Sequence, residues 1–144
     1  MNNIKIWTFF VLLVTAQFAY GGSFYSAPSS GGSIATSVSI EDKGIYNLVV
    51  SVQFLNEPFD KAPYTSEDYE EMINRLNVMW RGVVLKRVLG QSNYKVSDLA
   101  GLRQKIDEDI FKLVGEARKK HGVKASAEVV YSIGSFYLVN LNKE

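Results

Sequence analysis

The sequence predicts an α+β fold in which two helices pack on one face of a small antiparallel sheet. Three observations predict it. Two segments with the alternating pattern of strands come first, two segments with helical spacing follow, and a third strand-like segment comes last. The order strand, strand, helix, helix, strand lets both helices cover one face of a sheet whose last strand pairs with the hairpin.

The first two strands are expected to form a hairpin. In residues 33–40, apolar or β-branched residues alternate with small ones, which is the period of a half-buried strand. Residues 45–55 alternate in the same way. The polar residues 41–44 between them form a short turn, so the two strands should pair antiparallel.

The first helix is expected to begin near Ser66, after a loop at residues 56–64 that holds two of the three prolines. Thr65 or Ser66 can cap it, and two acidic residues follow at the positive end of the helix dipole. Gly90 is expected to end the helix. Its apolar stripe consists of Tyr69, Met72, Ile73, Leu76, Met79, Trp80, Val83 and Leu85 or Val88.

The second helix is expected to start with Ser97 or Asp98 as its cap and to close at Gly122. Its apolar stripe consists of Leu99, Leu102, Ile106, Ile110, Leu113 and Ala117. Residues 126–141 form the expected last strand. Gly134 interrupts the alternation there and predicts a bulge or a bend.

The segments before the first strand predict export. Residues 1–21 combine a weakly cationic start, a short apolar run and small residues near the end, as in a signal peptide or a short membrane anchor. Residues 22–32 are rich in glycine and serine and are expected to be a flexible tether. Residues 33–144 then form a single domain, either free in the periplasm or anchored to the inner membrane.

Composition argues against several classes of function. The chain has 16 basic and 15 acidic residues, so no strong positive field attracts nucleic acid. It has no cysteine, which excludes disulfides, thiolate nucleophiles and cysteine zinc sites. The single histidine, His121, is expected to be solvated at a helix end. No catalytic, cofactor-binding or metal-binding residues are predicted, and the protein is not expected to be an enzyme.

Charged helix ends suggest a candidate interface. Lys86, Arg87 and the basic residues near the end of the second helix could form a patch opposite the acidic start of the first helix, and such patches could meet between copies in head-to-tail assembly. Scattered, solvated charge is the alternative. Two aromatic residues of the tether could also contact a partner. The candidate interface residues are Phe24, Tyr25, Glu67, Asp68, Glu70, Glu71, Arg118, Lys119, Lys120 and Lys124.

Three stretches of the chain resemble the periplasmic domain of the FliL family of flagellar basal-body-associated proteins. The first is the apolar strand at residues 45–55, which runs into the polar break NEP. The second is residues 73–99, INRLNVMWRGVVLKRVLGQSNYKVSDL, similar to the long helix of the family and the connection after it. The third joins the helical LRQKIDEDIFKL of residues 102–113 to the closing strand VVYSIGSFYLV of residues 129–139.

The resemblance implies a stomatin/prohibitin-like fold and a role in the bacterial flagellar motor. Subunits of such a protein would form a ring around the stator units and support torque, swimming or swarming, with the chain itself and stator proteins as partners. Two features depart from the family. The leader looks cleavable, whereas the family usually keeps a transmembrane anchor, and residues 140–144 extend past the closing strand.

Two other functions remain open from the residues alone. A free periplasmic or secreted binding module of similar fold could hold an envelope protein or a peptide with Phe24, Tyr25 and its exposed strand edges. A small hydrolase would need two of the many carboxylates to converge in one pocket. Neither requires a cofactor.

Overall fold

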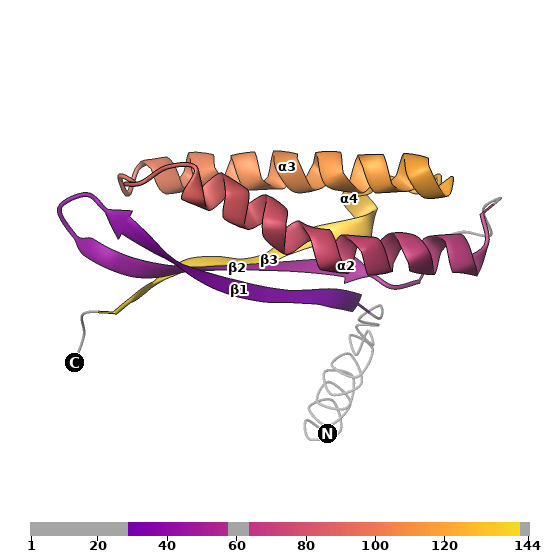
Figure 1. The fold of residues 1–144 in the computed structure, drawn as a ribbon, viewed down its shortest axis with the longest axis horizontal. Coiled ribbons are helices and arrows are strands. Elements are labelled where there is room, and N and C mark those ends of the chain that lie inside the picture. The colour runs from indigo at the N-terminus through magenta and orange to yellow at the C-terminus, as the bar shows by residue number, and fades with distance from the viewer. Residues whose placement is uncertain (1–28, 58–63, 142–144) are drawn as a thin grey trace, which may run out of the picture.

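The computed structural model describes residues 29–57 and 64–141. Two strands, two long helices, one helical turn and a last strand follow one another along the chain (Figure 1). They are β1 (Ser29–Ile40), β2 (Gly44–Leu55), α2 (Ser66–Leu89), α3 (Asp98–His121), α4 (Ala127–Val130) and β3 (Tyr131–Asn140). The predicted α+β class and the order of the main elements are confirmed. Within the described ranges, none of the helices has the length and apolar character needed to cross a membrane.

The sheet has three strands in the order β1-β2-β3, and both neighbouring pairs are antiparallel. The predicted hairpin joins β1 to β2, with Ile40 opposite Gly44 beside the turn. Asp42 and Gly44 adopt left-handed backbone angles there, with φ of 60° and 91°. Glycine adopts such angles without strain, and aspartate tolerates them better than most residues.

The first strand begins earlier than expected. Residues 29–32, assigned from their composition to a flexible tether, pair with residues 52–55 of β2. Gly31 and Gly32 have φ of 131° and 146°, and a side chain at Gly31 would collide with the carbonyl oxygen of Val52. The glycines therefore permit a close backbone approach. The rest of the expected tether, residues 22–28, lies outside the described residues.

The last predicted strand is also shorter than expected, because α4 occupies its first residues. Ser126 caps this turn by accepting a hydrogen bond from the backbone of Glu128, at 3.3 Å. Residues three apart share one face of a helix, so Ala127 and Val130 are both buried, with exposed fractions of 3% and 0%. The apolar residues that suggested a strand here fit one turn of helix equally well.

The bulge predicted at Gly134 is confirmed. Ser51 pairs with Ser135, but the next residue, Val52, pairs with Ile133, so Gly134 is the extra residue. A Cβ at this position would lie 3.1 Å from the Oγ of Ser51. The absence of a side chain lets the bulged strand stay close to β2.

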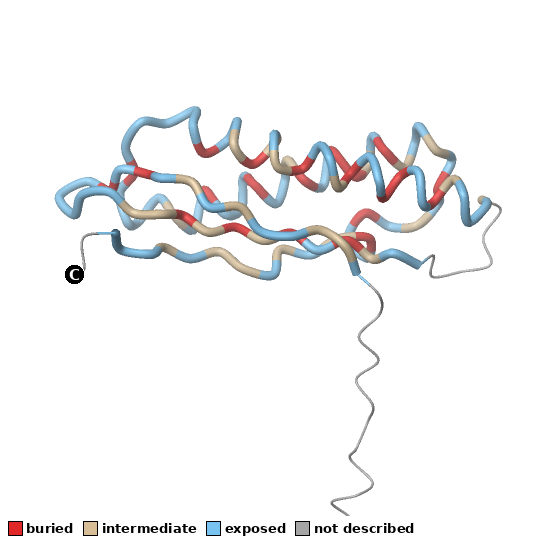
Figure 2. Tube along the Cα trace, turned by 60° about the horizontal axis from the view of Figure 1, so that its bottom comes forward, coloured by how far each residue is buried: buried red, intermediate tan, exposed pale blue. Residues whose placement is uncertain are grey.

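The core lies between the sheet and the two long helices, whose inner faces are buried in Figure 2. The stripe predicted for the first helix is correct over most of its length. Val84 is fully buried in place of Met79, which is 38% exposed, while Val83 is half-buried. The largest fully buried side chains are Trp80, Tyr69, Phe54, Ile40, Leu48, Met72, Leu76, Ile106, Ile110, Val50, Val52 and Val84.

Of the two predicted caps, Thr65 is the one that caps α2, and it does so through a capping box with Asp68. The Oγ1 of Thr65 accepts a hydrogen bond from the backbone N–H of Asp68 at 3.0 Å, and an Asp68 carboxylate oxygen accepts one from the backbone of Thr65 at 3.1 Å. Replacing Thr65 with alanine should lower the free energy of unfolding by about 1 kcal/mol, because a helix N–H loses its partner. Urea denaturation of Thr65→Ala would measure the loss. Ser66→Ala is the control and should change stability little.

Candidate functional site

The charged helix ends lie side by side at one end of the molecule. The helices α2 and α3 form an antiparallel hairpin, so the acidic start of α2 lies beside the basic end of α3 (Figure 1). Nδ1 of His121 lies 3.5 Å from a carboxylate oxygen of Glu71. Hydrogen bonds from Thr65 lower the pKa of Asp68, and the nearby charge of His121 contributes to the same direction.

This arrangement corrects the premise of the candidate interface. The basic end of α3 was expected to lie opposite the acidic start of α2, but the fold puts the two next to each other within one chain, where Glu71 and His121 are close enough to pair. Arg118 is half-buried, whereas Lys119, Lys120 and Lys124 are exposed. Their place at and just after the C-terminal turn of α3 is favourable for the helix dipole. The remaining acidic residues of the set, Glu67 and Glu70, are also exposed.

The structure differs from the expectation that His121 is solvated, and it does not describe two other candidates of this site. The side chain of His121 is only 13% exposed, because it packs against the start of α2 instead of extending into water. Its Nε2 is buried without a hydrogen-bond partner among the described residues. Phe24 and Tyr25, the aromatic candidates of the expected tether, lie outside the described residues.

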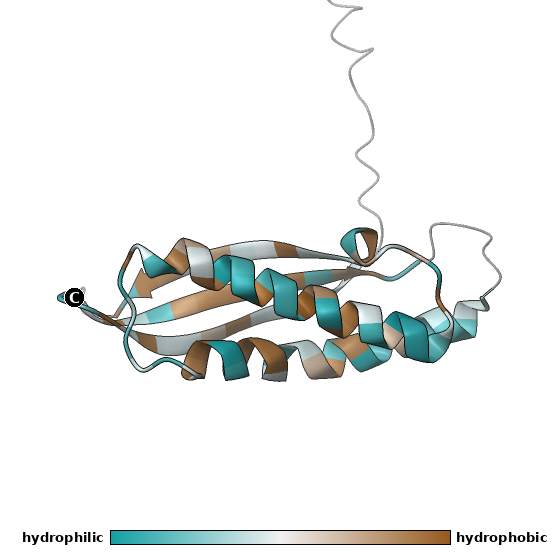
Figure 3. Ribbon diagram, turned by 90° about the horizontal axis from the view of Figure 1, so that it is seen from above, coloured by the Kyte–Doolittle hydropathy of each residue, from teal (hydrophilic) through white to brown (hydrophobic). Residues whose placement is uncertain are grey.

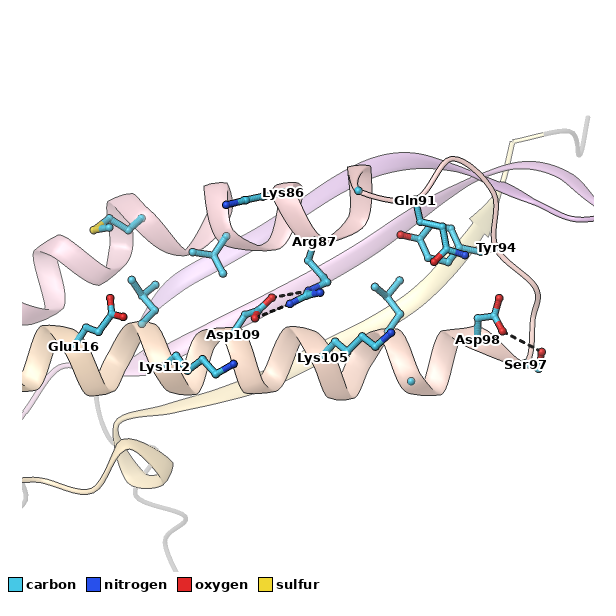
Figure 4. Close-up of a pocket in the computed structure, with 16 residues that line it drawn as sticks. Lys86, Arg87, Gln91, Tyr94, Ser97, Asp98, Lys105, Asp109, Lys112 and Glu116 are labelled. Carbon is cyan, nitrogen blue, oxygen red and sulfur yellow. Dashed lines mark hydrogen bonds and ion pairs between the residues drawn. The ribbon is translucent and has the colours of Figure 1, made fainter.

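A groove between α2 and α3 holds an ion pair that the sequence did not reveal. Arg87 donates hydrogen bonds from Nε and Nη2 to the two carboxylate oxygens of Asp109, at 2.6 and 2.8 Å (Figure 4). The hydrogen bond from Arg87 lowers the pKa of Asp109, and the same bond raises the pKa of Arg87. Lys105 and Lys112 also line the groove. The two partners are 22 positions apart, and only the helical hairpin brings them together.

The ion pair should make stability depend on pH. Because the pKa of Asp109 is lower in the folded chain, the pair stabilises the fold at neutral pH and its contribution is lost as the pH falls through the folded pKa. Asp109→Asn should therefore lower Tm modestly at pH 7, and the difference from the parent should shrink in acid. Thermal denaturation between pH 7 and pH 3 would measure it. Glu116→Gln, at an exposed position of the same helix, is the control, and an equal dependence in both variants would contradict the assignment.

The long helices cover one face of the sheet, and in the described ranges β1 and β3 lie at its edges without a further paired strand. Ile45, Tyr137 and Val139 lie on the opposite, outer face with exposed fractions of 54%, 53% and 42%. Serines from all three strands, Ser33, Ser51 and Ser135, form one cross-strand row on it. Neither β1 nor β3 contains a charged residue or a proline. Two long, uncharged edges are unusual, because proteins commonly protect edge strands with lysine, proline or short length.

Only the end of the β1 edge is covered in the described part of the chain. The backbone of Tyr94 donates to the carbonyl oxygen of Ser39 at 2.9 Å and accepts from the N–H of Glu41 at 2.8 Å. This single parallel bridge is held in place by the Tyr94 hydroxyl, which donates to the carbonyl oxygen of Val88 at the end of α2. Sequence periodicity could not reveal it, because Tyr94 belongs to no regular element.

Comparison of the chain with known protein families, curated proteins and solved structures finds no match. Within residues 29–57 and 64–141, no group of His, Asp or Glu side chains has the arrangement of a metal site. Three features of the described surface remain for a functional argument. They are the uncharged edge strands β1 and β3, the groove between α2 and α3 that holds Arg87 and Asp109, and the start of α2 beside the end of α3.

Proposed function

We propose that this protein is a non-enzymatic accessory protein of the bacterial flagellar motor, which self-assembles in the periplasm into a ring-like structure and supports the stator units. The resemblance of three stretches to the FliL family motivates the proposal. The observation that carries the assembly step is the pair of long strand edges without charge or proline. Such edges are templates for pairing with another chain.

The mode of action would be mechanical. A collar of subunits that binds one state of the stator better than another shifts the stator population toward that state, by no more than its difference in affinity. This role needs surfaces rather than reactive groups. Two carboxylates of α3 already have partners within the chain. Asp109 pairs with Arg87, and Asp107 accepts a hydrogen bond from Tyr131 at 2.9 Å.

Motility of a strain that lacks the protein tests this function. On soft agar, the deletion should reduce swimming or swarming while electron microscopy still shows normal numbers of flagellar filaments. Expression of the parent chain from a plasmid should restore spreading. Normal swimming and swarming of the deletion strain would exclude the motor role.

A second candidate is a binding module in the periplasm or outside the cell that holds an envelope protein or peptide. The exposed apolar side chains of the outer sheet face, Ile45, Tyr137 and Val139, favour this alternative. An extended peptide could add to a strand edge and contact this face with alternate side chains. Unchanged motility together with a stable envelope complex recovered by crosslinking would support it.

A further inference from the structure

We propose that copies of this chain join edge to edge, with β3 of one copy lying parallel to β1 of the next, so that their sheets become one continuous curved sheet. This inference rests on the self-assembly part of the proposed function and does not depend on the flagellar role. It names the interface: the outer edges of β1 and β3, in place of the charged helix ends.

The β1 edge has the right groups in the right direction. Successive residues of a strand direct their N–H and C=O groups to alternate sides. Because Ser39 and Glu41 bond to Tyr94 on the outer side, Ser33, Ala35 and Ser37 present their backbone groups to that same side. The bridge to Tyr94 is itself parallel, so this edge already forms one pair of backbone hydrogen bonds in the orientation that we propose.

The two edges also lie at the same level of the sheet. Ser30 and Tyr131 both pair with Phe54, and Val38 and Asn140 both pair with Tyr46. A neighbour placed beside β3 without a shift would therefore present residues 30–37 of its β1 to residues 131–139 of β3. The bridge to Tyr94 begins just beyond this span and leaves it open.

Side-chain size and charge fit a second copy of the chain. On the outer face, β1 presents the exposed small residues Ser33, Ala35 and Ser37, whereas β3 presents the large side chains of Tyr137 and Val139. Small residues beside large ones allow close packing across a new strand pair. The formal net charge of the whole chain is only +1, so copies do not repel each other strongly.

The helix layer determines the shape of the assembly. The helices α2 and α3 lie side by side over the sheet (Figure 3), and packed helices are about 8–10 Å apart, so each copy needs about 16–20 Å in this layer. The three strands of one copy are only about 14 Å wide in total, at the usual spacing of about 4.8 Å between strands. A flat stack would crowd the helices, so the sheet must curve with the helices on the convex side. For layers about 10 Å apart, closure requires on the order of ten to forty copies.

Cysteine crosslinking in intact cells tests the interface, because the chain has no cysteine of its own. Ser33 and Ser135 lie at one level, opposite Ser51 on its two sides, and they are too far apart within one copy to form a disulfide. The full chain with Ser33→Cys and Ser135→Cys should give a ladder of multimers on a non-reducing gel after mild oxidation. A shift of two residues, the smallest that keeps the same side chains on the outer face, would instead give the ladder with Ala35→Cys and Ser135→Cys.

The single variants and a displaced pair are the controls. Ser33→Cys and Ser135→Cys expressed separately should remain uncrosslinked, and expressed together they should give dimers only, because each chain then has one reactive edge. Ser39→Cys with Ser132→Cys, at opposite ends of the sheet, should give no ladder. A dimer from Ser135→Cys alone would indicate a two-fold β3 contact and overturn the proposal, as would the lack of a ladder from both double variants.

The outcome separates this inference from the flagellar role. A ladder in a strain whose deletion mutant swarms normally would retain the edge interface and exclude the motor function. Impaired swarming without any ladder would exclude the edge interface and retain the motor function.

Discussion

Replacing Val50 with lysine is expected to unfold the domain. Val50 is completely buried between the sheet and the helices, where Ile34 and Phe136 are its cross-strand neighbours. No buried residue of the described chain is charged, so the new ammonium group would have no buried carboxylate to pair with. An unpaired buried charge costs several kcal/mol, which is comparable to the total stability of about 5–15 kcal/mol of a typical domain.

Val49→Lys is the matched control, because the adjacent residue of β2 faces the open side of the sheet. Its cross-strand neighbours are Ala35 and Tyr137, and a lysine there can extend into water. Circular dichroism during urea denaturation should show a folded Val49→Lys variant with a loss of no more than about 1 kcal/mol, and little or no folded Val50→Lys. The reverse result would mean that the strand presents its other face to the helices.

The sequence predicted elements best where periodicity and capping agreed. The first helix has apolar residues at spacings of three and four, a cap at Thr65 and an end at Gly90, and its structure runs from Ser66 to Leu89. The second helix closes at Gly122, which has a left-handed φ of 69° as expected for a C-terminal glycine. These signals are local, so a single segment contains all the information needed.

The wrong predictions concern features that depend on contacts between residues far apart in the sequence. Composition could not distinguish a glycine in a linker from Gly31, whose role depends on the approach of Val52 from another strand. Likewise, the acidic and basic helix ends were assigned to opposite sides, because their proximity depends on the antiparallel hairpin that brings Glu71 to His121. The sequence predicted β1 and β3 as strands, but it could not show that these two lie at the edges, because that depends on the order of strands in the sheet.

Replacing Trp80 with alanine is expected to cost about 3–5 kcal/mol, the usual range for removing a buried tryptophan. Trp80 lies in the middle of α2, is completely buried and is among the largest side chains of the core. The guanidinium of Arg81 lies 4.9 Å from the centre of its ring, so the substitution also removes a cation–π contact. Urea denaturation followed by circular dichroism would measure the loss, since the variant lacks much of the tryptophan fluorescence.

Trp80→Phe separates packing from hydrogen bonding at this position. The indole Nε1 is buried and has no hydrogen-bond partner among the described residues, so phenylalanine removes a polar group that the fold leaves unsatisfied. The variant should lose only about 1–2 kcal/mol, from the smaller apolar area of the ring. A loss as large as that of Trp80→Ala would mean that Nε1 has a partner in solution, such as a bound water, and that this bond rather than packing fixes the contact of α2 with the sheet.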